Sequence, residues 1–129
     1  MRIMAIDFGA KRVGVASTDE TGRFALPRAV LKNDKSLLKE ILEFVKSERI
    51  ERVVIGESRD FKNLPNPIMQ DIEKFKKELE AKGLKVILHP EILTTVEARR
   101  VQGGTNMTDA SAAALILKNY VDTMYNVEQ

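Results

Sequence analysis

The chain has 129 residues, no cysteine, one histidine and a formal net charge of +2 at pH 7. This length suits one domain with a substantial core, so we expect residues 1–129 to form a single domain. The lack of cysteine excludes disulfides and thiolate metal sites, and a single histidine argues against a zinc enzyme. No apolar run reaches the length of a signal peptide or the ~20 residues of a membrane span, so a reducing cytoplasm is the expected location.

Three strands are predicted at the start of the chain. Residues 2–8 form an apolar run that ends at Gly9, and residues 12–17 and 23–31 form two further runs. Residues 19–22 are rich in turn-forming types and predict the second turn of this meander. Pro27 lies inside the third run, which indicates an edge strand or a β-bulge, because proline cannot donate a ladder hydrogen bond.

Helices and strands alternate after the meander. Apolar residues recur at helical period over residues 37–45, with Asn33 or Asp34 as the expected cap. A strand is expected over residues 52–55, a helix over 68–82, a strand over 84–88, a short helix over 96–101 and a last helix over 109–125. The order βββαβαβαα predicts an α/β fold with a five-stranded mixed sheet flanked by helices.

Four carboxylates lie at positions where such a fold places its site. Asp7 ends the first strand, Glu57 follows the fourth, Glu91 follows the fifth, and Asp109 opens the last helix. If the first, fourth and fifth strands are parallel, their carboxyl ends meet at one edge of the sheet, where α/β proteins bind ligands. The alanine-rich start of the last helix can pack across the sheet and bring Asp109 to the same edge.

Such a cluster predicts a metal site with catalytic function. Mg²⁺ and Mn²⁺ prefer hard oxygen ligands, and carboxylates from separate elements supply them. Two ions about 4 Å apart can activate a water and stabilise the leaving oxygen of a phosphodiester. We therefore expect Asp7, Glu57, Glu91 and Asp109 to hold two Mg²⁺ or Mn²⁺ ions and to carry the catalysis.

Basic residues near these carboxylates are candidate phosphate contacts. Gly9, Lys11 and Arg12 form the loop after the first strand, and Arg99 and Arg100 lie on the expected short helix. Each group could bind a phosphate of a nucleic acid. A solvated turn or a solvated helix face explains the same residues, so both interpretations stay open.

Three segments resemble the YqgF family, the RuvC-like pre-16S rRNA nucleases that are also described as Holliday junction resolvases. They are DFGAKRVGVA at residues 7–16, EILTTVEA at 91–98 and DASAAALIL at 109–117. The resemblance implies an RNase H-like fold and a metal-dependent endonuclease with catalytic roles for Asp7, Glu91 and Asp109. It implies structured RNA, the precursor of 16S rRNA, as the substrate, with a four-way DNA junction in recombination and repair as the alternative.

The chain also departs from the family pattern. Pro90 and Ile92 stand where the family has aspartate and arginine around the glutamate, and residues 105–108 replace its basic stretch. Related RuvC resolvases place a catalytic glutamate near the end of the fourth strand. Glu57 therefore remains a candidate for the second metal carboxylate beside Glu91.

Two other classes of function are weighed against the nuclease. Actin-like ATPases and sugar kinases share an acid on the first strand, but they are much longer because they need two domains for the nucleotide. A non-catalytic nucleic-acid-binding module with the nuclease fold fits the altered motifs. Either a monomer or a homodimer is compatible with the sequence, although a resolvase that cuts two strands symmetrically is expected to be a dimer.

Overall fold

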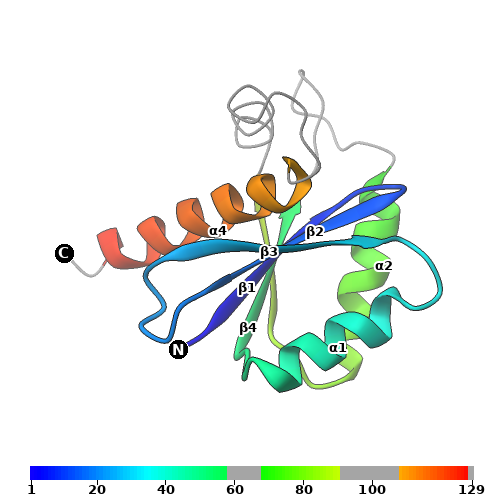
Figure 1. Ribbon diagram of the computed structural model, residues 1–129, viewed down its shortest axis with the longest axis horizontal. Helices are drawn as coiled ribbons and strands as arrows, with labels where there is room; N and C mark the ends of the chain where they lie inside the picture. Colours follow the sequence, from blue (N-terminus) through cyan, green and yellow to red (C-terminus); the bar gives the residue numbers. More distant parts are fainter. Residues whose placement is uncertain (58–67, 91–107, 128–129) are drawn as a thin grey trace.

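The computed structural model describes residues 1–57, 68–90 and 108–127 of the chain. Five strands form one sheet in the order β3-β2-β1-β4-β5 (Figure 1). They are β1 (Ile3–Phe8), β2 (Arg12–Thr18), β3 (Ala25–Lys32), β4 (Arg52–Glu57) and β5 (Val86–Pro90). The meander β1–β2–β3 is antiparallel, whereas β4 pairs parallel with β1 and β5 pairs parallel with β4. The predicted mixed sheet, with its first, fourth and fifth strands parallel, is confirmed.

Helices cover both faces of this sheet. α1 (Leu37–Ser47) and α2 (Ile68–Ala81) lie on one face, and α4 (Thr108–Val127) lies on the other (Figure 1). The short helix predicted over residues 96–101 falls outside the described residues. Within the described part of the chain, none of the helices is long and apolar enough to cross a bilayer.

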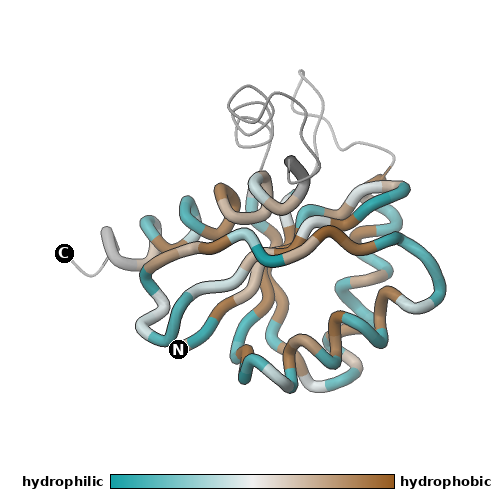
Figure 2. Tube along the Cα trace, viewed as in Figure 1, coloured by the Kyte–Doolittle hydropathy of each residue, from teal (hydrophilic) through white to brown (hydrophobic). Residues whose placement is uncertain are grey.

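The two faces of the sheet differ in the size of their side chains. Alternation along β1 directs Met4, Ile6 and Phe8 toward α1 and α2, where they pack with Phe75 and other large residues. Figure 2 shows apolar residues along the strands, with hydrophilic residues on the outer sides of the helices. Each fully buried large apolar side chain contributes about 1.5–3 kcal/mol, so this face supplies much of the stability.

The opposite face, against α4, includes several alanines among its larger apolar residues. Ile3, Ala5 and Ala16 of the sheet pack there with Ala113 and other residues of α4. Ala113 is fully buried. Alanines at a helix–sheet contact let a helix approach the strands closely.

A β-bulge interrupts the edge strand β3, as Pro27 predicts. Val15 pairs with Ala29, but the next residue, Ala16, pairs with Pro27. Arg28 is therefore the extra residue between the two pairs. A bulge bends an edge strand and redirects the side chain of the extra residue.

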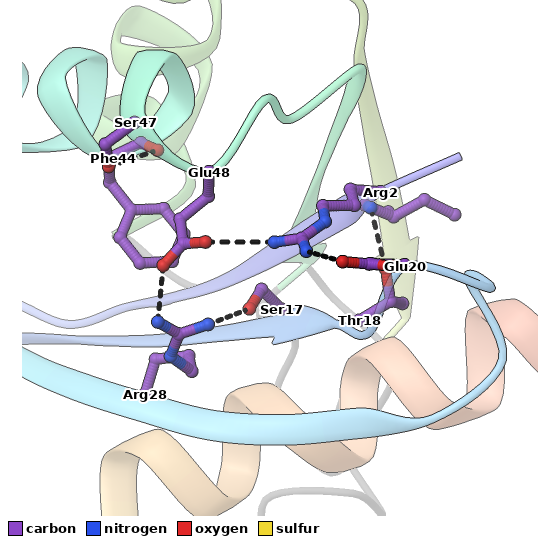
Figure 3. Close-up of polar contacts among 9 residues, drawn as sticks. Arg2, Ser17, Thr18, Glu20, Arg28, Phe44, Ser47 and Glu48 are labelled. Atoms are coloured by element: carbon purple, nitrogen blue, oxygen red, sulfur yellow. Dashed lines mark hydrogen bonds and ion pairs between the residues drawn. The ribbon is translucent and has the colours of Figure 1, made fainter.

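The redirected Arg28 takes part in an ionic network at the amino end of β1. Its guanidinium donates to Ser17 Oγ at 3.0 Å and to the carboxylate of Glu48, and it lies 5.4 Å from the centre of the Phe44 ring. Arg2 donates to the same carboxylate at 3.0 Å. Figure 3 shows that these contacts tie the end of α1 to β1 and β3. The network thus fixes α1 against the sheet at the end away from Asp7.

Candidate active site

Asp7 lies near the carboxyl end of β1, on the face that α4 covers. Ile3 and Ala5 occupy the same row of β1 and belong to the core beneath α4. Its neighbours Ile6 and Phe8 are buried on the other face, while Asp7 itself is partly exposed. Strand alternation therefore directs one carboxylate out of an otherwise apolar strand, toward the α4 side of the sheet edge.

Two glycines flank Asp7 on the neighbouring strands. Gly14 of β2 pairs with Asp7. The register of β1 and β4 runs to the pair Ile6–Ile55, and one further step brings Gly56 beside Asp7 on the other side. His89 of β5 pairs in turn with Gly56. Neither flanking residue has a side chain beyond a hydrogen atom, so no side chain of these two positions crowds the carboxylate.

The direction of α4 brings its first turn toward the same edge. Nη1 of Arg52, the first residue of β4, donates to the Tyr120 hydroxyl at 2.7 Å and lies 3.8 Å from Met124 Sδ. The later half of α4 therefore covers the amino end of β4. The helix rises about 1.5 Å per residue, so its start lies about 16 Å back, near the carboxyl end of the strand. Figure 1 shows the start of α4 at this end of the sheet, and Asp109 is the second residue of the helix.

Glu57 has a different position from the one expected of a loop residue. It is the last residue of β4, paired with Pro90, and it continues the row of Val53 and Ile55 that faces α1 and α2. The pleat therefore places Glu57 and Asp7 on opposite faces of the sheet.

The other predicted site residues lie beyond what the structure describes. Glu91, Arg99 and Arg100 are outside the described ranges, and for Asp109 only the place in the helix is described. Among the described side chains, no three histidines or carboxylates are grouped closely enough to share a metal ion. The structure thus joins Asp7 with the start of α4 and separates both from Glu57.

The loop after Asp7 is a tight turn that requires glycine. The Gly9 N–H donates to the Arg12 carbonyl at 3.0 Å and closes a four-residue turn. A Cβ at Gly9 would lie 2.5 Å from that carbonyl oxygen, which is closer than non-bonded atoms approach. Ala10, Lys11 and Arg12 are exposed on this turn. The turn therefore presents two basic residues at the edge of the sheet that holds Asp7.

Asn33, the residue after β3, is hydrogen-bonded to this turn. Its backbone N–H donates to the Lys11 carbonyl at 3.0 Å, and its Nδ2 donates to the Gly9 carbonyl at 2.7 Å. The sequence suggested Asn33 or Asp34 as a helix cap, but α1 begins at Leu37, and Asp34 accepts the Ser36 N–H at 2.9 Å just before it. The role of Asn33 had no local signal, because its side-chain contact spans 24 residues.

His89 and Tyr120 connect β5 to α4 on the side of Gly56 away from Asp7. Their rings meet edge to face with centroids 5.9 Å apart. Burial lowers the pKa of His89 below its ordinary value, so its imidazole is neutral at neutral pH. Since Tyr120 also accepts the hydrogen bond from Arg52, this aromatic pair helps to fix where α4 crosses the sheet.

These features define the chemistry that the edge can support. A carboxylate flanked by glycines on both neighbouring strands suits a hard cation such as Mg²⁺ or Mn²⁺, which binds oxygen ligands and keeps several waters. The basic turn beside it can position a phosphate group. The arrangement therefore favours reactions at a phosphate ester.

Comparison with known protein families agrees with this chemistry. Residues 1–123 match the family profile described as RuvX, Holliday junction resolvase. A protein of Thermoanaerobacter pseudethanolicus described as "Putative pre-16S rRNA nuclease" is 32% identical over 138 residues, which cover 98% of this chain and 99% of the relative. A protein of Heliobacterium modesticaldum with the same description is 35% identical over 133 residues, covering 95% and 89%.

Solved structures support the fold. Thermus thermophilus RuvC superimposes with a TM-score of 0.63 at 14% identity, covering 98% of this chain and 97% of RuvC. The fowlpox virus Holliday junction resolvase gives a TM-score of 0.62 at 15% identity, covering 96% and 99%. The predicted RuvC-like, RNase H-like fold is therefore confirmed.

Proposed function

The chain belongs to the RuvX family of Holliday junction resolvases, and we propose that it is an endonuclease. Its active site is built around Asp7 at the carboxyl edge of the sheet. The observation that carries this proposal is the place of the Asp7 carboxylate between Gly14 and Gly56. A negative charge near the end of a buried strand, flanked by glycines on both neighbouring strands, is suited to binding cations.

Three acids would form the metal site. Asp7, Glu91 and Asp109 would hold Mg²⁺ or Mn²⁺, two ions in all, because they come from separate elements that lead to one edge. Glu57 is the alternative to Glu91, but its row on β4 faces α1 and α2, so we assign the second carboxylate to Glu91. When bound, the ions would supply charge neutralisation and an activated water for phosphodiester hydrolysis.

Basic residues would position the substrate. Lys11 and Arg12, on the turn fixed by Gly9 and Asn33, would contact the scissile phosphate or a neighbouring one. Arg99 and Arg100 would add backbone contacts. Such contacts carry no sequence information, so recognition would depend on the shape of the nucleic acid.

We propose precursor 16S rRNA as the substrate, because curated relatives that match nearly the whole chain are described as nucleases of that RNA. An enzyme with this substrate would work in the cytoplasm, where ribosomes are made. A four-way DNA junction is the second candidate, supported by the description of the family and by the similar fold of RuvC, which has been solved with a Holliday junction. A resolvase would act as a homodimer, whereas an RNA nuclease could act as a monomer.

A cleavage assay tests the proposal. Wild-type protein and Asp7→Asn would be incubated with a structured precursor RNA and with a four-way DNA junction while Mg²⁺ is titrated. We expect metal-dependent cleavage of the RNA that falls by more than about 100-fold in Asp7→Asn, since even the loss of a residue that only orients a metal ligand costs about 10–100-fold.

The matched control is Asp122→Asn, which removes an exposed carboxylate from α4 that pairs with Lys118 at 3.6 Å. This variant should cleave like the wild type. Equal cleavage by Asp7→Asn and wild type, or no metal-dependent cleavage of either substrate, would contradict the proposed function.

A further inference from the structure

A second basic surface lies on the opposite layer of the molecule, along α1. An open hollow of about 430 Å³ runs beside this helix and reaches the end of α2; we call it the α1 groove. Its floor includes the half-buried Leu38 and Leu42. Four exposed lysines line it: Lys35, Lys39, Lys46 and Lys82.

The lysines of the α1 groove lack acidic partners. One carboxylate, Glu43, lines the groove with them, and within the described part of the chain none of the four makes an ion pair. Two lysines outside the groove are paired with acids at helical spacing. Lys76 lies 3.2 Å from Glu80, and Lys118 lies 3.6 Å from Asp122. Four unpaired cations around one hollow produce a local positive potential that favours a polyanion.

A larger neighbouring hollow differs in its charge. It has a volume of about 680 Å³, reaches Ala10 of the β1–β2 turn and shares Lys35 and Leu38 with the α1 groove. Three carboxylates and two lysines line it: Asp34, Asp71, Glu78, Lys35 and Lys74. Positive potential is therefore concentrated in the α1 groove. The groove begins next to the larger hollow, which reaches the β1–β2 turn.

The start of α1 and the β1–β2 turn lie at the same end of the molecule (Figure 1). Asn33, four residues before α1, is bonded directly to that turn. A ligand that contacts Lys11 and Arg12 at the edge of the sheet could therefore continue around this end and along α1. Only a ligand longer than a single nucleotide or phosphate could reach both places.

We propose that the α1 groove binds the sugar–phosphate backbone of a second helical segment of the nucleic acid whose cleavage is proposed above. The inference rests on that proposed function. Lysine ammonium groups bind phosphates as point charges without reading bases, so the groove would favour folded or branched substrates by their shape. A short substrate that fills only the Asp7 site would not use it.

The test measures binding of the full chain carrying Asp7→Asn, which prevents cleavage, at several salt concentrations with Mg²⁺ present. The probes are a long structured RNA, a short RNA hairpin, a DNA duplex and polyglutamate. Adding Lys39→Gln and Lys46→Gln should weaken binding of the long RNA by about tenfold and reduce the slope of log affinity against log salt by about 2. Binding of the short hairpin should change by less than about twofold.

The matched control is the pair Lys76→Gln and Lys118→Gln, which removes the same charge from lysines outside the groove. The proposal is overturned if this control pair weakens binding of the long RNA as much as Lys39→Gln and Lys46→Gln do. It is also overturned if both RNAs lose affinity equally, if the long RNA does not bind at all, or if polyglutamate binds as tightly as RNA.

Cleavage separates this inference from the proposed function. With Asp7 intact, the protein that carries Lys39→Gln and Lys46→Gln should still cleave the short hairpin at the wild-type rate. If it does so and the long RNA shows no dependence on the groove lysines, the groove proposal fails and the nuclease stands. If groove-dependent binding is found but no variant cleaves, the nuclease proposal fails and the surface stands.

Discussion

The two turns of the β1–β2–β3 meander are built in different ways. Residues 19–24 join β2 to β3 and satisfy their own polar groups. The Asp19 carboxylate accepts the Thr21 hydroxyl at 2.7 Å and the Arg23 N–H at 3.4 Å, and Gly22 has a positive φ of 76°. The carboxylate of this turn is thus used within the turn.

The β1–β2 turn owes its shape to a remote residue. Asn33 bonds to the carbonyls of Gly9 and Lys11, while Lys11 and Arg12 are exposed. Asp7 precedes this turn and points toward α4. Under the proposed function, the first turn holds charged groups in a fixed position for a ligand, whereas the second only reverses the chain.

Gly9→Ala should have the largest effect on stability and cleavage among the substitutions in these two turns. The added methyl group would lie 2.5 Å from the Arg12 carbonyl oxygen, so the turn must open. We expect a loss of about 1–3 kcal/mol in the free energy of unfolding. Cleavage should fall by about 100-fold, because a displacement of about 1 Å at a site can cost that much. Urea unfolding and the cleavage rate measure the two effects; wild-type values for both would show that the turn has no fixed shape.

Asn33→Leu removes the side-chain donor and keeps a similar volume. It leaves the Gly9 carbonyl without this partner, which should cost about 1–3 kcal/mol of stability. Steady-state kinetics should show a raised KM for RNA, because Lys11 and Arg12 are no longer held in place. An unchanged KM with lowered stability would reduce Asn33 to a purely structural residue.

Gly22→Ala is the equivalent change in the other turn. Alanine at φ 76° is strained, so we expect a loss of about 1 kcal/mol in unfolding free energy. Cleavage by the folded protein should equal that of the wild type. If Gly22→Ala reduced cleavage as strongly as Gly9→Ala, the distinction between the two turns would not hold.

Asp19→Asn tests, through the pH dependence of stability, whether the carboxylate of the β2–β3 turn has a purely structural role. The Thr21 hydroxyl, aided by backbone N–H groups, lowers the pKa of Asp19 below its ordinary value of 3.8. A carboxyl with a lowered folded pKa stabilises the protein above its unfolded pKa, and this stability is lost as pH falls through the folded value. Wild type should be more stable than Asp19→Asn at pH 7, and the gap should narrow as the pH falls below 3.8. A gap that stays constant with pH would contradict this role.

Local signals in the sequence were enough for much of the fold. Gly83 ends α2 with a φ of 88°, Pro27 lies in a bulged edge strand, and the turn at residues 19–22 uses Asp19 as its type suggests. Strand and helix positions agree to within a few residues, because hydrophobic period and turn-forming residues act over short distances.

The site was less accessible to such reasoning. Asp7 was identifiable because an acid rarely ends a buried strand, but the glycines beside it become visible only once the strands are in register. The face of Glu57 depends on whether it belongs to β4 or to the following loop, a difference of two residues from the expected end of the strand. The contacts of Asn33 depend on tertiary structure, which no local pattern reports.

The location of the bound metal tests the central claim most directly. Crystals of the wild type and of Asp7→Asn would be soaked in Mn²⁺ and its anomalous scattering measured. We predict a Mn²⁺ peak in the wild type within about 2.0–2.3 Å of the Asp7 carboxylate, on the α4 face of the sheet, and no peak there in Asp7→Asn. A peak on the α1/α2 face beside Glu57, or one that persists beside residue 7 in Asp7→Asn, would contradict the account.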